Sequence, residues 1–543
     1  MSLSTTLAGV PWLAANAPGY RKFRAALDDP RAVQKQVLLS YLHRNADTAF
    51  GRLHGFSEIR TAEELQERVP LATYADFEPW IDRIAAGEKR VLTSSPVRAL
   101  ELTGGASSAA KRIPYTAELQ REIRRAVAPW IFDLYKDRPR LALGCAYWSI
   151  TPMALEEERR PSAVRVGFEE DGEYLGGFWK RLADATLAVP GDVRLVRDVE
   201  SFRYVTLLCL LRRRDLSLIS VWHPSFLTLL VKALPQHWAN LCRDIAEGTL
   251  NPPEPLPPPV RDALLLRLRP RPHRAAELGW RSPDDLPRIW PNLRLISCWG
   301  DSHAALHLEE LRRAFPGVEI QPKGLLATEA FVTLPYEGRT PVAVRSHFFE
   351  FLPEGSAGER PRLVHELEMG GVYSVAVTTG GGLYRYLLED RVEVDGFVDR
   401  TPSLRFLGKE GHVSDLCGEK LHESFVAGAL ARTFARLGLA PRFALLAPDS
   451  THYTLYLEKE ELPAALAGTL EEELAANPQY RASVALGQLA PAQVFRVDGD
   501  AFLLYLRRCR ELGQRLGDVK PLALSPLSGW SELFPGEYSA DPI

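Results

Sequence analysis

Between Leu141 and Pro235 the chain alternates short apolar runs with helical patterns, and this alternation restricts the fold more than any other feature. LALGCAYWSI and LSLISVWHP read as buried strands, whereas Pro224 to Leu234 has helical spacing. Strands that alternate with helices are typical of a largely parallel sheet covered by helices. The sequence therefore predicts an α/β core. Residues 251–260 contain six prolines and predict an extended surface connection within it.

The segments on either side of this core have different patterns. The first hundred residues are predicted to be mainly helical, with Thr61 as an N-cap and Glu64 three residues later. From Leu363 to Val394, two long alternating runs flank Gly380-Gly381-Gly382, which predicts a hairpin in a β-rich subdomain.

The C-terminal quarter of the chain mixes helical and strand patterns. We therefore divide the chain into a large N-terminal domain, residues 1–397, and a small C-terminal α+β domain, residues 398–543. The small domain is predicted to contain a helix over 421–437, strands at 443–446 and 453–457, a helix over 462–476 and a last helix near 501–516.

Composition excludes several functional classes. The net charge of −3, from 66 basic and 69 acidic residues, supplies no broad attraction for nucleic acid or anionic membranes. The longest uncharged stretch, Leu216 to Val231, is too short to span a bilayer, and the N-terminus lacks the basic region of a secretory signal. The six cysteines are scattered singly, with no C-x-x-C pair. We expect a cytoplasmic protein with reduced thiols and neither a nucleic-acid nor a membrane partner.

Residues 103–111, TGGASSAAK, form a small, hydroxyl-rich segment that ends in a cation. Such a segment can wrap main-chain N–H groups around a phosphate, with hydroxyls and a lysine as further donors. It is not a P-loop, because Lys111 is followed by neither Ser nor Thr. The alternative interpretation is a plain surface turn.

Two further acidic positions carry possible ligand chemistry. Thr328 could meet a phosphate and Glu329 could hold Mg²⁺, and the alternative is a helix N-terminus with a favourable acidic residue. Asp390 could accept both hydroxyls of a ribose, and the alternative is a solvated strand end. His303 and His307 lack the intervening glutamate of zinc proteases and are interpreted as ordinary helix residues.

The order of these segments along the chain resembles one family, the Gretchen Hagen 3 (GH3) acyl-acid amido synthetases of the adenylate-forming superfamily. The Arg-, Leu-, Ala- and Pro-rich composition indicates a bacterial-type member. The segments that carry the resemblance are FGRLHGFSEIRTAEELQERVPLATYADFEPWIDRIAAGEKRVLT (50–93), LTGGASSAAKRIPYT (102–116), LLATE (325–329), TTGGGLYRYLLEDRVEVDGF (378–397), LRFLGKEGHVSDLCGEKLHE (404–423) and, near the C-terminus, GQRLGDVKP.

The resemblance implies a fold and a reaction. The fold would be a large N-terminal adenylate-forming domain, which binds ATP and the acyl acid, and a small mobile C-terminal domain. The enzyme would use ATP and Mg²⁺ to adenylate a small carboxylic acid, and would then transfer the acyl group to an amine, such as an amino acid, to form an amide.

The resemblance also implies the residues that contact the phosphates of ATP. The side chains would be those of Thr103, Ser107, Ser108 and Lys111, joined by the main-chain N–H groups of Gly104, Gly105 and Ala106. Thr328 would contact the α-phosphate.

Other residues of the implied site have different roles. Glu329 would hold Mg²⁺ and contribute to catalysis, and Asp390 would bind the ribose hydroxyls. Lys409 and Lys420 would lie near the nucleotide, and Lys520 would be the mobile catalytic lysine of the small domain.

Departures from the family pattern leave two alternatives open. Thr103-Gly104-Gly105-Ala106 stands where the family carries Ser-Ser-Gly-Thr, and Leu325 stands where it carries an aromatic residue. One alternative is a ligase that delivers the acyl group to a thiol, such as coenzyme A or a carrier protein. The other is a degenerate member that binds nucleotide or acyl ligand without turnover.

Overall fold

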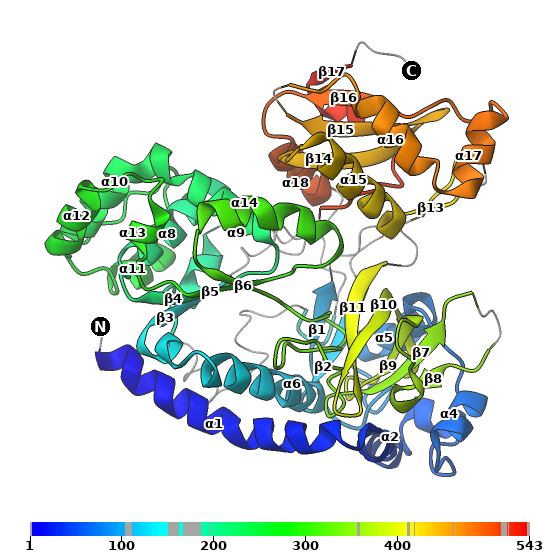
Figure 1. The fold of residues 1–543 in the computed structure, drawn as a ribbon. Coiled ribbons are helices and arrows are strands. Elements are labelled where there is room, and N and C mark those ends of the chain that lie inside the picture. The colour runs from blue at the N-terminus through cyan, green and yellow to red at the C-terminus, as the bar shows by residue number, and fades with distance from the viewer. Residues whose placement is uncertain are drawn as a thin grey trace. The chain divides into compact units, whose positions relative to one another are not determined.

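The computed structural model describes residues 3–103, 111–149, 162–166, 186–196, 198–355, 359–409, 413–417, 419–459, 461–511, 519 and 521–539. The chain divides into two compact units (Figure 1). The N-terminal unit comprises residues 1–300, 311–388 and 393–405, and the C-terminal unit comprises 301–310, 389–392 and 406–543. The main change of unit therefore follows Arg405, later than the boundary that the sequence suggests after residue 397.

The N-terminal region is helical, as predicted. Thr61 caps a helix, since its hydroxyl oxygen accepts a 3.2 Å hydrogen bond from the main-chain N–H of Glu64. Trp12 packs in one hydrophobic cluster with Ile131 and with Leu218 of the parallel sheet. The helices of this region are α1 (Leu3–Leu27), α2 (Pro30–Asn45), α3 (Ala49–Leu53), α4 (Ala62–Arg68), α5 (Tyr74–Ala85) and α6 (Ala117–Lys136).

The predicted α/β core is confirmed as a four-stranded parallel sheet in the order β3-β4-β5-β6. β4 is buried along its whole length, which explains why LSLISVWHP reads as a buried strand, and β5 is buried in the same way. The strands are β3 (Cys145–Trp148), β4 (Leu216–Ser220), β5 (Leu295–Cys298) and β6 (Glu319–Pro322).

The prediction of an extended connection over residues 251–260 is wrong in part. Residues 251–260 are not extended throughout, because α11 (Pro258–Leu265) begins inside the proline-rich segment. Proline is tolerated in the first turn of a helix, where its missing N–H has no helical acceptor to lose. The other elements are η1 (Pro139–Leu143), η3 (Gly191–Leu195), α8 (Val199–Leu211), α9 (Pro224–Lys232), α10 (Leu234–Glu247), α12 (Pro272–Gly279), α13 (Leu286–Ile289), η4 (Ser302–His307) and α14 (Leu308–Ala314).

The β-rich region contains a five-stranded sheet in the order β11-β10-β9-β7-β8. The predicted hairpin is confirmed, since β9 and β10 are neighbours and residues 380–382 lie between them. The strands are β7 (Phe348–Pro353), β8 (Arg362–Leu363), β9 (Val372–Thr378), β10 (Tyr386–Val398) and β11 (Thr401–Lys409), with η5 (Val364–Glu366) after β8.

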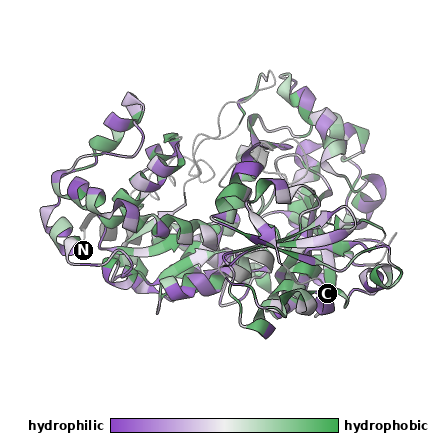
Figure 2. Cartoon of the chain, turned by 90° about the horizontal axis from the view of Figure 1, so that it is seen from above, coloured by the Kyte–Doolittle hydropathy of each residue, from purple (hydrophilic) through white to green (hydrophobic). Residues whose placement is uncertain are grey.

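The C-terminal unit has the predicted α+β character. Its four-stranded sheet, in the order β14-β15-β16-β17, packs Leu455 against Leu430 and Leu470 of two helices. Figure 2 shows hydrophilic and hydrophobic residues along the helices, as expected where a helix buries one face. The elements are β12 (Val413–Ser414), β13 (Leu421–His422), α15 (Glu423–Leu437), β14 (Phe443–Asp449), β15 (His452–Glu458), α16 (Leu466–Leu474), α17 (Pro478–Ala485), β16 (Gln493–Val497), α18 (Ala501–Glu511), α19 (Trp530–Leu533) and β17 (Gly536–Tyr538).

The cysteines are free thiols, as the sequence suggests. Burial raises the pKa of Cys145, Cys209 and Cys298 to about 12 each, so these thiols stay protonated near neutral pH. In the part of the chain that the structure describes, every helix is too short or too polar to cross a bilayer.

Candidate functional site

The glycine- and serine-rich segment connects two antiparallel strands, β1 (Val97–Thr103) and β2 (Lys111–Thr116). Thr103 and Lys111 are paired across the ladder, so both ends of the segment meet at one end of the hairpin. The Lys111 ammonium lies 5.9 Å from the ring centroid of Tyr74. Gly104, Gly105, Ala106, Ser107 and Ser108 lie outside the described residues, as does the side chain of Thr103.

Thr328 and Glu329 lie in a tight bend after β6, and both are half-buried. The main-chain N–H of Ala327 closes the bend through a 2.9 Å hydrogen bond to the carbonyl of Ala330. The alternative interpretation as a helix N-terminus is therefore wrong. A hydroxyl and a carboxylate are hard oxygen donors of the kind that Mg²⁺ prefers, so these two residues fit that ion.

A buried carboxylate joins this bend to the glycine turn between β9 and β10. Glu122 of α6 accepts hydrogen bonds from the Gly380 N–H at 2.9 Å and from Nδ1 of His347 at 3.0 Å. The Phe331 N–H donates to Nε2 of His347 at 3.1 Å, which assigns the ring proton to Nδ1. The Glu122 and His347 side chains are almost wholly buried, so these bonds are shielded from water.

The same turn is bonded to the β1–β2 hairpin. The Thr116 hydroxyl, at the end of β2, donates to the Gly380 carbonyl at 2.9 Å and accepts from the Leu119 N–H at 3.1 Å, which caps α6. A Cβ atom on Gly380 would lie 2.2 Å from Oε1 of Glu122, and one on Gly381 would lie 2.7 Å from the Pro114 carbonyl oxygen. Glycine is required because the turn packs directly against these groups.

Sequence reasoning missed Glu122 and His347. Glu122 stands three residues after Leu119 and four before Ala126, so helical spacing places it on the buried face of α6. A glutamate on a buried helix face needs hydrogen-bond donors from the protein. The position of Glu122 on that face was therefore the signal that the sequence offered. No comparable signal marks His347, because its partners are distant in the sequence.

Arg385 is a second buried anchor beside the turn. Its Nε lies 3.0–3.1 Å from the two carboxylate oxygens of Glu350, and its Nη1 donates to the carbonyls of Gln66 and Val69. Arg385 itself has φ +48°, a conformation that a tertiary constraint must hold. The β9–β10 connection is therefore fixed on both sides.

Asp390 and Lys409 are brought together in the C-terminal unit. Asp390 is only 2% exposed, so the interpretation as a solvated strand end is wrong. The Lys409 ammonium lies 3.6 Å from Oδ1 of Asp390 and offsets the charge that β10 buries there.

Lys420 is exposed and has a positive φ of 45°, next to the buried Glu419. The Glu419 carboxylate accepts from the N–H groups of Leu416 at 2.7 Å and Cys417 at 2.9 Å, and from the Tyr453 hydroxyl. Burial alone would raise the pKa of Glu419, but these hydrogen bonds lower it overall. Glu419 thus fixes the backbone beside Lys420.

Lys520 lies outside the described residues. The structure therefore places Thr103 opposite Lys111, Thr328 beside Glu329, and Asp390 beside Lys409.

Aromatic side chains gather beyond the carboxyl ends of the parallel strands. Trp222 follows β4 and Trp299 follows β5, and their ring centroids are 5.6 Å apart. The Lys323 ammonium, after β6, lies 4.5 Å from the Trp222 centroid and 5.9 Å from that of Trp130. Trp222 and Trp299 are half-buried, whereas His223 is buried and caps α9. In open parallel sheets this edge is where ligands bind.

Comparison with protein families identifies three consecutive domains. The chain matches the GH3 family N-terminal domain over residues 19–320, the GH3 family central domain over 340–409 and the GH3 family C-terminal domain over 428–526. These matches cover most of the chain and occur in the order of the motifs.

Individual relatives agree with the domain matches. The chain is 25% identical over 468 residues to the indole-3-acetic acid-amido synthetase GH3.6 of Arabidopsis thaliana, covering 79% of this chain and 75% of the relative. It is 26% identical over 508 residues to the indole-3-acetic acid-amido synthetase GH3.8 of Oryza sativa subsp. indica, covering 85% and 83%. The solved structure of the AtGH3.15 acyl acid amido synthetase in complex with 2,4-DB shares the fold, with a TM-score of 0.83 at 20% identity over 97% of this chain and 98% of that one.

We expect Gly380→Ala to lower the free energy of unfolding of the N-terminal unit by about 1–3 kcal/mol, because the added Cβ would overlap the Glu122 carboxylate. The matched control is Gly468→Ala in α16, where a Cβ meets no atom within 4 Å and alanine improves helix propensity. Scanning calorimetry should show a lower Tm only for Gly380→Ala. Equal Tm values for this variant and the parent would contradict the close packing of the turn.

Glu122 and His347 should behave as one energetic unit. Glu122→Gln keeps the shape but places an amide N–H₂ among donors, so we expect a loss of about 2 kcal/mol. A double-mutant cycle with His347→Gln, measured by urea unfolding, should give a coupling energy of at least about 1 kcal/mol. Strict additivity would mean that the two side chains do not depend on each other.

Proposed function

Because the chain belongs to the GH3 family, we propose that it is an ATP-dependent acyl-acid amido synthetase. The enzyme adenylates a small carboxylic acid and transfers the acyl group to an amine, an amino acid in the first instance. The observation that carries this proposal is the ordered match of all three GH3 domains between residues 19 and 526. A cytoplasmic location, where ATP is supplied, is part of the proposal.

The first step joins two anions. The acid's carboxylate oxygen attacks the α-phosphorus of ATP, the bond to the β-phosphate oxygen breaks, and pyrophosphate leaves with its electron pair. Charge neutralisation is therefore the main catalytic demand. Lys111 and, after domain movement, Lys520 would place ammonium groups against the phosphates, while Thr328 contacts the α-phosphate.

Loop residues would surround the phosphate chain. The Thr103–Lys111 pairing supports this role, since it places a cation where the two strands that flank residues 104–110 end. The groups assigned to the phosphates are the hydroxyls of Thr103, Ser107 and Ser108 and the main-chain N–H groups of Gly104, Gly105 and Ala106.

Glu329 would hold Mg²⁺, which supplies positive charge that offsets the phosphates when bound. Asp390 would accept hydrogen bonds from the ribose hydroxyls, with the Lys409 ammonium orienting its carboxylate from 3.6 Å. Lys420, held next to the buried Glu419, would lie near the nucleotide.

The second step forms the amide. A neutral amine attacks the carbonyl carbon of the acyl-adenylate, the carbon–oxygen bond to phosphate breaks, and AMP departs while the amine loses a proton. The acyl group would lie beside Trp222 and Trp299, whose half-buried rings offer an aromatic wall at the ligand-binding edge of the sheet. Indole-3-acetic acid, the acid named for the curated relatives, belongs at the head of the test panel.

Pyrophosphate release from ATP and Mg²⁺ should depend on an added acid. We expect release with one or more members of a panel of aryl, indolyl and aliphatic acids, and an amide product by mass spectrometry once amino acids are added. A thioester that forms only with coenzyme A would instead support the thiol-directed ligase. ATP binding without release for any acid would support the degenerate binder.

Lys520→Ala should reduce acid-dependent pyrophosphate release by at least about 100-fold, because it removes a cation from a transition state with growing negative charge. Lys459→Ala, a lysine elsewhere in the C-terminal unit, is the matched control and should leave the rate near that of the parent. An unchanged rate in Lys520→Ala would remove this residue from the mechanism.

A further inference from the structure

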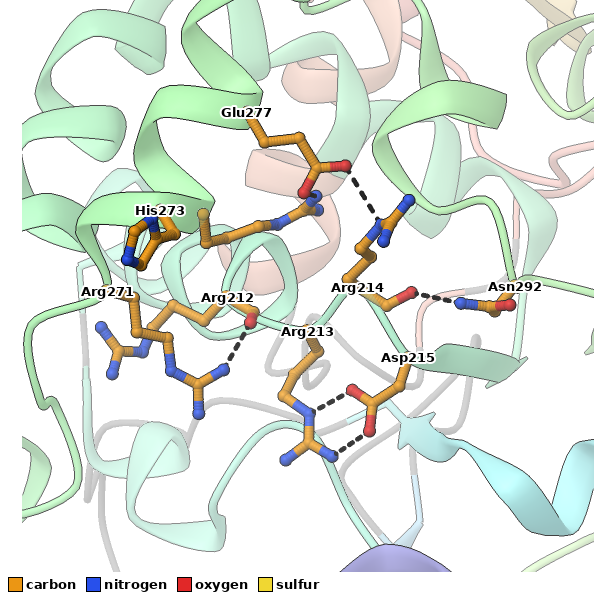
Figure 3. Close-up of a pocket in the computed structure, with 9 residues that line it drawn as sticks. Arg212, Arg213, Arg214, Asp215, Arg271, His273, Glu277 and Asn292 are labelled. Atoms are coloured by element: carbon orange, nitrogen blue, oxygen red, sulfur yellow. Dashed lines mark hydrogen bonds and ion pairs between the residues drawn. The ribbon is translucent and has the colours of Figure 1, made fainter. Parts of the chain in front are cut away.

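A pocket of about 420 Å³ lies at the amino-terminal edge of the parallel sheet, away from the motif segments (Figure 3). Its lining residues come from the chain just before β4, from the first turns of α12, and from the approach to β5. Asp215 of this pocket immediately precedes β4, whereas Trp222 lies beyond its other end. The two places are separated by the length of a buried strand.

Five arginines line the pocket against only two carboxylates. Asp215 accepts two hydrogen bonds from Arg213, each at 2.8 Å, and a third from the Cys145 thiol. Glu277 is shared by Arg274 at 2.8 Å and Arg214 at 3.1 Å. Both carboxylates are thus already paired, and the pocket retains an excess of positive charge.

The two remaining arginines bond to main-chain oxygens. Arg212 donates to the Arg269 carbonyl at 2.6 Å, and Arg271 donates to the Arg212 carbonyl at 2.7 Å. Arg212 is 6% exposed, and its Nη1 is buried with no hydrogen-bond partner in the described part of the chain. Burial and the neighbouring charge of Arg271 both lower the pKa of Arg212. Figure 3 shows the side chains of Arg212 and Arg271 lying beside each other.

The N-terminus of α12 adds further positive potential. α12 begins at Pro272, so the main-chain N–H groups of His273 and Arg274 have no acceptor within the helix, and both residues line the pocket. The positive end of a helix attracts anions and disfavours basic side chains. The C-terminus of α8 explains why arginines follow Leu211, but it does not explain Arg271 at the N-terminus of α12.

We propose that this pocket binds a small phosphate-bearing anion at a site distinct from the nucleotide site. Guanidinium forks match the geometry of phosphate oxygens, and five arginines line this pocket against two carboxylates that are already paired. A second pocket of about 330 Å³ shares Arg212, Arg213 and Arg271 and adds apolar side chains such as Leu264. That space suits the organic part of a phosphate ester.

Isothermal titration of the full chain with inorganic phosphate and with phenyl phosphate tests the proposal, with KCl matching the ionic strength. We expect both probes to bind, phenyl phosphate more tightly, and Arg271→Gln to weaken each by about tenfold or more. Arg271 is exposed, so its replacement leaves the buried core intact. Arg261→Gln, an exposed arginine of α11 outside both pockets, is the matched control and should bind like the parent.

Other variants separate this site from the nucleotide site. Lys111→Gln should leave binding of both probes unchanged. Loss of binding in Lys111→Gln together with normal binding in Arg271→Gln would place the phosphate in the nucleotide loop and overturn the proposal. No binding of either probe to the parent would also overturn it. Tighter binding of inorganic phosphate than of phenyl phosphate would assign the pocket to the free ion. It would overturn the inference that the ligand is a phosphate ester.

Discussion

The Glu122 carboxylate is the constraint on which the arrangement of the motif segments depends. Buried beneath the glycine turn, it cannot be satisfied by water, so it must take its hydrogen bonds from protein groups. The donors come from Gly380 and His347, which are 258 and 225 residues away in the sequence. His347 then accepts from Phe331, two residues beyond Glu329. One side chain of α6 therefore sets the relative positions of the glycine turn and the bend that carries Glu329.

This arrangement separates the residues that hold the site from the residues that would contact ligand. The residues that hold the site are buried and make hydrogen bonds to main-chain groups of the motif segments or of residues next to them. They are Thr116, Glu122, His347 and Arg385. The bend that carries Glu329 is half-buried and closed by a main-chain hydrogen bond. Reactive groups on short bends can be precise only when the backbone beneath them is fixed by packing.

Local patterns predicted the architecture because they depend on neighbouring residues. The strand-like runs at β3 and β4, the hairpin around residues 380–382 and the Thr61 cap all follow from spacing and residue type. The anchors could not be predicted in the same way, because their partners are distant and belong to no local pattern. The burial of Asp390 likewise depends on Lys409, a residue of the neighbouring strand.

The parallel sheet carries positive charge at both edges, but the charge is balanced differently. At the carboxyl edge, aromatic faces surround the Lys323 ammonium. At the amino edge, Arg212 and Arg271 bond to carbonyl oxygens, which carry no net charge. β4 connects the two edges and is buried throughout, whereas coupling between distant sites needs an element with two discrete arrangements. An anion at the amino edge should therefore stabilise the folded unit more than it alters the reaction.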